Sequence, residues 1–243
     1  MPIDYHRLEA MVPLYKDLVA AGIHYGTHGR MDEAADQRRM KAMSESGCNY
    51  IGFGAESAHP ETLRALNKGG QTLSHGLETI KVAGRLWEVP RAMTMAMRNC
   101  IEYGIHANLT WIAGCLDEDL ERLKHSVAFM LWQIGLYEQN HIPASAVNLG
   151  MFSLQYYPGT PMEKKSEVQH ELTRVFNLTF DPITGKPICN DALEYYCLGL
   201  DDATNVMFGP DGEPLNFSKM PNDQFLQVRE LIDSGRTLDI LSL

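Results

Sequence analysis

The chain has 243 residues, a hydrophobic fraction of 44% and a net charge of −10 at pH 7. This composition is ordinary for a globular protein with a buried core, and it disfavours both disorder and nonspecific binding to nucleic acid phosphates. No apolar run approaches the roughly 20 residues of a membrane span, and the N-terminus lacks the features of a signal peptide. The 5 cysteines include no CxxC pair, which indicates free thiols and a cytoplasmic protein.

Helix-like and strand-like segments alternate along the first three quarters of the chain. Helices are predicted at residues 4–21, 33–45, 60–68, 74–84, 90–103 and 120–134, and extended segments at 24–30, 50–55, 105–113 and 146–156. Glycines that favour left-handed helix caps end several of these helices. Strands that alternate with helices at this spacing predict parallel β/α units, in either a barrel or a doubly wound sheet.

The pattern changes after residue 162. Two similar turn sequences, at 180–187 and 208–214, suit hairpins or tight loops, and a last helix is predicted at 222–234. We therefore divide the chain into a partial barrel at 1–162 and an irregular α+β appendage at 163–243.

Side chains alternate along a strand, so one face of each barrel strand points into the lumen. Along residues 50–56 the lumenal positions are Gly52, Gly54 and Glu56, which leave room for a ligand beside a carboxylate. The other interpretation is that the glycines allow close packing and that Glu56 caps the next helix. The lumenal face continues with polar and small residues at His106, Asn108, Thr110, Ile112, Gly114, Asn148 and Gly150. This polarity favours a ligand-lined interior.

The segment 24–30 places His24, His28 and Arg30 on one face. The two histidines have a spacing that keeps both on one side of a strand, as metal ligands would be, but they are also ordinary polar packing residues. Arg30 suits the binding of an anion, or else a salt bridge to a barrel carboxylate.

Five short motifs occur in order between residues 4 and 162. They are Arg30-Met31-Asp32, Gly47-Cys48-Asn49-Tyr50-Ile51-Gly52-Phe53-Gly54-Ala55-Glu56-Ser57, Asn67-Lys68-Gly69, Trp111-Ile112-Ala113-Gly114 and Tyr157-Pro158-Gly159-Thr160-Pro161. Together they resemble the radical S-adenosylmethionine (SAM) superfamily, especially the branch that often carries a cobalamin-binding domain upstream. The resemblance implies an α/β fold, a partial (β/α) barrel of about four parallel strands.

The resemblance also implies roles for individual residues. Cofactor-binding positions are Arg30, Glu56, Ser57, Thr110, Ile112, Gly114 and Asp117. The last four belong to a fifth-strand motif, usually Gly-x-Ile-x-Gly-x-x-Glu, that packs against adenine; here Thr110 replaces the first glycine and Asp117 the glutamate. The polar lumen adds substrate-binding positions at His28, Gly54, Asn108 and Asn148. No catalytic residue and no metal ligand is assigned.

The chain departs from the family in its cysteines. The family holds a 4Fe–4S cluster with a CxxxCxxC loop after the first strand, and none of the cysteines here has that spacing. We therefore expect this chain to be a portion of an enzyme, with the cluster ligands in an upstream segment or subunit. The implied cofactors are SAM, the 4Fe–4S cluster and, as a further candidate, cobalamin. The implied chemistry is 5′-deoxyadenosyl-radical chemistry or methyl transfer on a small-molecule substrate.

Two alternatives stay open. One is a non-catalytic half-barrel that binds a partner or a small ligand. The other is an unrelated metal-dependent β/α-barrel enzyme that uses His24, His28 and Glu56.

Overall fold

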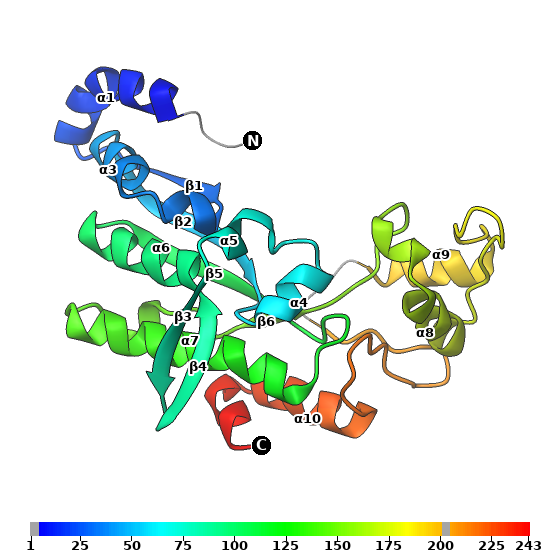
Figure 1. Cartoon of the computed structure of the whole chain (residues 1–243). Helices are drawn as coiled ribbons and strands as arrows, with labels where there is room; N and C mark the ends of the chain where they lie inside the picture. The colour runs from blue at the N-terminus through cyan, green and yellow to red at the C-terminus, as the bar shows by residue number, and fades with distance from the viewer. Residues whose placement is uncertain (1–4, 201–204) are drawn as a thin grey trace.

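The computed structural model describes residues 5–200 and 205–243, and its central feature is a four-stranded sheet (Figure 1). The strands lie in the order β1 (Tyr25–Gly29), β2 (Cys48–Glu56), β5 (His106–Ala113) and β6 (Met151–Ser153). Each neighbouring pair is parallel. The predicted fold class is confirmed: the chain is an α/β protein with a partial barrel of four parallel strands and further irregular elements.

Helices precede, connect and follow the strands. They are α1 (Tyr5–Ala20), α2 (Met31–Ala34), α3 (Gln37–Glu45), α4 (Pro60–Ala65), α5 (Gly70–Ser74), α6 (Arg91–Glu102), α7 (Leu120–Gln139), α8 (Ser166–Phe176), α9 (Asp191–Leu198) and α10 (Asn222–Asp233), with 3₁₀ turns at Ala144–Ala146, Pro161–Lys164 and Thr237–Ser242. Asp36 and Asp119 cap α3 and α7 because their side chains accept hydrogen bonds from first-turn backbone N–H groups. Methionines of α3 and α6, together with Phe129 of α7, join the outer side chains of the sheet in the main core.

The two faces of the sheet differ sharply in burial. Along β5, Ala107, Leu109, Trp111 and Ala113 are at most 1% exposed, whereas the alternate residues, from His106 to Ile112, are exposed or half-exposed. We call the side of the sheet away from α3, α6 and α7 the open face. The lumenal face predicted from sequence is this open face.

The helix predicted at 74–84 is wrong. Only Gly70–Ser74 is helical there, and the chain continues into an antiparallel hairpin of β3 (Leu77–Val82) and β4 (Arg85–Pro90). Ala83 and Gly84 both have positive φ, as a two-residue hairpin turn requires. Alternate side chains of the hairpin are buried, namely Ile80, Val82, Trp87 and Val89. The segment therefore follows the two-residue burial pattern of a strand and not the pattern of a helix.

The N-terminal side of the sheet is sparsely covered. β1 is an edge strand with β2 as its one strand neighbour in the described chain. α1 continues through Pro13 as one helix. Of the apolar residues on one of its faces, Leu8, Met11, Tyr15 and Leu18, only Leu8 is buried. Leu14 and Leu18 are 76% and 42% exposed.

The opposite edge is covered by the C-terminal segment. Phe225, Val228 and Ile232 of α10 pack into the main core, Arg229 donates to the Met151 carbonyl at 2.9 Å, and Thr237 donates to the Leu149 carbonyl at 2.8 Å. A second cluster is built around α8, with Leu172 and Phe176 packing against Tyr156, Tyr196 and other apolar residues of the appendage. The domain division at residue 162 stays a prediction.

Both turn sequences of the appendage form as predicted. Short antiparallel bridges join Phe180 to Pro187 and Phe208 to Pro214. In the first turn, the Asp181 carboxylate accepts from the backbone N–H and the hydroxyl of Thr184 and from the backbone N–H of Ile183, which lowers the pKa of Asp181. Separately, no helix in the described part of the chain is both long and apolar enough to cross a membrane.

Gly114 tests how tightly α10 packs on the end of β5. A Cβ there would lie 2.8 Å from Phe225 Cε2, and its φ is +82°, whereas Gly104 has a φ of +66° with open space around it. We expect Gly114→Ala to lower the free energy of unfolding by about 1–3 kcal/mol more than Gly104→Ala, since only the first adds overpacking to left-handed strain. Urea denaturation measures both, and equal losses would contradict the packing shown here.

Candidate functional site

A cavity of about 440 Å³ opens beside the C-terminal ends of β1 and β2. Its walls come from the β1–α2 turn, the end of β2, the α4–α5 loop and α6, and they include Arg30, Asp32, Gly54 and Lys68. The ends of parallel strands are where α/β folds place ligands, because several loops converge there. Of the residues assigned from sequence, Arg30 and Gly54 line this cavity.

Arg30 lies at the rim with its guanidinium 3.0 Å from Asp32, whose side chain is almost fully buried. The hydrogen bond to Asp32 raises the pKa of Arg30 above its ordinary value. The Arg30 side chain is 58% exposed, so its unused N–H groups face solvent and are available to an anion. The sequence left open either anion binding or a salt bridge, and the structure contains a salt bridge within the same turn.

Glu56 ends β2 in a left-handed conformation, with φ of +61°. The β2–β5 register shifts between Gly54 and Glu56, so a bulge re-aims the carboxylate. Oε1 lies 2.8 Å from where a Gly54 Cβ would stand, and 3.2 Å from Lys68 Nζ. Gly54 therefore makes room for the Glu56 side chain, and Lys68, which sequence reasoning left without a role, becomes part of the site.

Polar side chains lie across the open face in register. His28 pairs with Gly52, and Gly52 with Asn108, so these three positions form one row across three strands. The His28 ring covers Gly52, where a Cβ would come within 2.8 Å of Nδ1. Asn108 donates to the Tyr50 hydroxyl at 3.0 Å. The structure thus contains both features that the sequence offered as alternatives, close packing at Gly52 and a polar row across the open face.

The remaining predicted positions follow the same face. Gly54 pairs with Thr110, whose hydroxyl donates to the Phe53 carbonyl at 3.2 Å. Asn148 donates to the Leu109 carbonyl at 3.0 Å, and Ile112 is half-exposed on β5. Their assigned ligand contacts stay predictions.

Ser57 lies away from the open face and is fully buried. Its hydroxyl accepts from the His59 backbone N–H at 3.1 Å and lies 3.4 Å from the Ser126 hydroxyl of α7. Ser126 also accepts from the Ala58 backbone N–H at 3.0 Å. In this structure Ser57 therefore anchors the turn that follows Glu56, and its assigned cofactor contact stays a prediction.

The turn after β5 contains a buried carboxyl group that sequence reasoning missed. Glu118 is fully buried, and its Oε2 accepts from the backbone N–H groups of Gly114 and Cys115 at 2.9 and 3.2 Å. Desolvation raises its pKa to about 8 and raises that of the Cys115 thiol well above its ordinary value. Asp117, the predicted residue, is exposed and pairs with Lys219 at 2.9 Å, which lowers its pKa.

The sequence signal for Glu118 was ambiguous. Asp117 and Glu118 are adjacent acids after Gly114, and the family spacing selects the first. In the fold, Asp117 takes a left-handed φ of +61°, which turns its side chain to the surface and its neighbour inward. Only the turn geometry distinguishes the two carboxyl groups.

The metal-site alternative gains no support in the described residues. Within 5–200 and 205–243, no three His, Cys, Asp or Glu side chains form a group that could hold a metal ion. His24 Nδ1 instead lies 3.3 Å from the Gly47 carbonyl. Cys48, Cys100 and Cys115 are buried, whereas Cys189 and Cys197 are exposed in the appendage, so the cysteine residues of this chain do not fit a 4Fe–4S cluster.

The architecture is similar to that of solved enzymes. The structure of OxsB, a cobalamin-dependent SAM radical enzyme with aqua-cobalamin and SAM bound, matches with a TM-score of 0.51 and 15% identity over 94% of this chain and 32% of that chain. The radical SAM methyltransferase TsrM from Kitasatospora setae, with cobalamin and a [4Fe-4S] cluster bound, has a TM-score of 0.48 and 16% identity over 96% of this chain and 40% of that one. The OxsB likeness shows a shared fold, and this chain spans about a third of that enzyme's length. No family model and no curated protein matches the sequence.

Glu118 offers a pH-dependent test of the β5 turn. Its pKa in the folded state, about 8, lies above its ordinary value of 4.5, so the folded protein favours the protonated acid. The stability that the neutral Glu118 side chain allows is fully present below about pH 4.5. It is lost progressively as the pH rises from there through about 8, by about 5 kcal/mol in all. We expect Glu118→Gln to remove the fall in unfolding free energy between pH 6 and 8.5, measured by urea denaturation. The control variant Asp117→Asn should still show the fall in unfolding free energy. If Glu118→Gln also shows it, Glu118 is not the group that titrates.

Proposed function

We propose that this chain forms the SAM- and substrate-binding walls of a radical SAM enzyme that acts on a small molecule by radical chemistry or methyl transfer. The observation that carries the proposal is the polar open face of the parallel sheet, which ends in Glu56 beside a cavity of about 440 Å³. The likeness of the fold to OxsB supports it. Most side chains of the open face are polar or small, so their contact with water costs little free energy. Apolar residues such as Phe152, 37% exposed, are the exception, and their exposure favours a ligand or partner on this face.

The proposal assigns contacts with SAM to the described residues. In the proposal, the Glu56 carboxylate accepts hydrogen bonds from ribose hydroxyl groups, and the half-exposed Ile112 packs against adenine. SAM, when bound, supplies a sulfonium-activated methyl group and an activated adenosyl carbon. The polar row of His28 and Asn108 then faces the substrate and orients it by hydrogen bonds.

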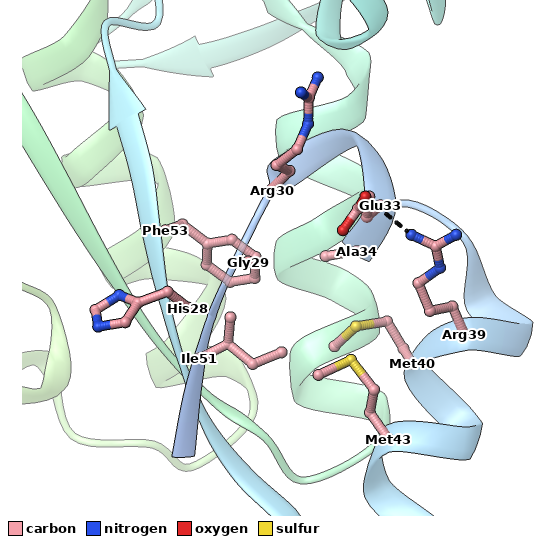
Figure 2. Close-up of a pocket in the computed structure, with 10 residues that line it drawn as sticks. All are labelled: His28, Gly29, Arg30, Glu33, Ala34, Arg39, Met40, Met43, Ile51 and Phe53. Atoms are coloured by element: carbon pink, nitrogen blue, oxygen red, sulfur yellow. Dashed lines mark ion pairs between the residues drawn. The ribbon is translucent and has the colours of Figure 1, made fainter. Parts of the chain in front are cut away.

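We further propose that the cluster, and cobalamin if it is used, come from a segment or subunit that pairs with the free edge of β1. A cavity of about 300 Å³ lies behind this edge, with Met40, Met43, Ile51 and Phe53 on its apolar wall (Figure 2). Figure 2 shows His28 on the other side of β1 from the two methionines. Side chains of an added strand could fill this space, while Leu14 of α1 offers further apolar surface.

A half-barrel that binds a ligand without catalysis remains the second candidate. The same polar face and cavity would serve it, and the two functions differ in whether SAM is the ligand. Binding of SAM to the chain therefore separates them.

We expect SAM to bind the chain in equilibrium dialysis with radiolabelled SAM. Glu56→Gln should weaken binding about tenfold, because it replaces charge-assisted hydrogen bonds with neutral ones. Glu45→Gln is the matched control, since Glu45 is a surface carboxylate paired with Lys41 at 3.8 Å. Absence of SAM binding, or equal effects of the two variants, would contradict the proposed function.

A further inference from the structure

The Asn67-Lys68-Gly69 motif has no role in the proposed function so far, yet its geometry is closely determined. α4 ends at Ala65 with Leu66 as its C-cap, and Asn67 follows with a left-handed φ of +55°. The backbone N–H groups of Lys68 and Gly69 both donate to the Leu63 carbonyl, at 2.9 and 3.0 Å. This arrangement is a helix C-cap in which asparagine takes the place of the usual glycine. The cap fixes the direction in which the Lys68 side chain leaves the loop.

Lys68 meets Glu56 across the end of β2. Nζ lies 3.2 Å from Glu56 Oε1, and the Glu56 side chain is 15% exposed against 59% for Lys68. The carboxylate is thus mostly withdrawn from water, while the ammonium group stays at the rim of the cavity that Lys68 lines. The other cation of that cavity, Arg30, donates to Asp32 instead.

The same carboxylate is restrained from its own strand. Glu56 has a strained, left-handed backbone, and its Oε1 lies where a side chain on Gly54 would stand. Across residues 5–200 and 205–243, Oε1 accepts from Lys68, and no hydrogen bond to Oε2 is formed. One oxygen is therefore fixed by the protein and the other is available to a ligand.

We infer that Lys68 is a positioning residue, which orients the Glu56 carboxylate for the ligand at the ends of β1 and β2. This inference rests on the proposed function, since it requires SAM to contact Glu56. Lys68 acts through Glu56 and does not itself touch the ligand. A carboxylate held by an ammonium group and by a strained backbone loses little rotational freedom when a ligand binds.

Dialysis with SAM across a set of variants tests this. Lys68→Met should weaken binding about five- to tenfold, and Lys68→Arg should restore it to within about twofold, because arginine keeps the charge and the donors. Lys41→Met removes a comparable surface pair, Lys41–Glu45, and should leave binding unchanged. The double variant Glu56→Gln with Lys68→Met should bind no more weakly than Glu56→Gln alone, because lysine then has no carboxylate to orient.

The outcomes separate the inference from the function on which it rests. Lys68→Met that binds SAM like the parent chain overturns the inference, provided that Glu56→Gln still weakens binding. Additive losses in the double variant also overturn it, since Lys68 would then contact SAM directly. No effect of Glu56→Gln overturns the proposed function and the inference together.

Discussion

Parallel pairing of β2 with β5 is the constraint on which the rest of the structure depends. The register places Gly52 beside Asn108 and Gly54 beside Thr110, so polar and small side chains share the open face. The intervening residues, such as Phe53 and Leu109, are then buried against the helices. A slip of one residue would exchange the two faces and bury the polar row, which would leave its donors without water.

Two adjacent strands end in the same way at the site. Glu56 is the last residue of β2, and Asp117 lies in the turn after β5. Each has a φ of +61° and a carboxylate paired to a lysine, Lys68 or Lys219. Such backbone strain persists only where surrounding contacts impose it, and it clusters at functional sites. The two acids differ in what surrounds them. Glu56 is mostly withdrawn from water beside a cavity, whereas Asp117 is exposed and leaves the buried position to Glu118.

The two edges of the sheet are also unequal. The C-terminal helix α10 and the 3₁₀ turn that follows it bond to the Leu149 and Met151 carbonyls beside β5, and they close that side (Figure 1). The β1 side has a cavity with one apolar wall behind the strand and an exposed Leu14 on α1. Edge strands of parallel sheets are normally covered, and this difference between the edges is the reason for the proposed pairing at β1.

The sequence by itself determined the features that are local in the chain. The period-two pattern of 105–113 fixed which side chains face the helices, and Gly and Pro residues marked both hairpin-like turns of the appendage. The hairpin at 77–90 was missed because its alternation is short. The turn at Ala83 and Gly84 and the packing of Trp87 and Val89 against the core distinguish it from a helix. The tertiary structure alone decided that Lys68 reaches Glu56 and that Glu118, not Asp117, is the buried acid. Both outcomes depend on left-handed backbone at a strand end, in a turn or at a helix cap, where a change in one φ angle redirects a side chain. The sequence of the neighbouring residues does not reveal that angle.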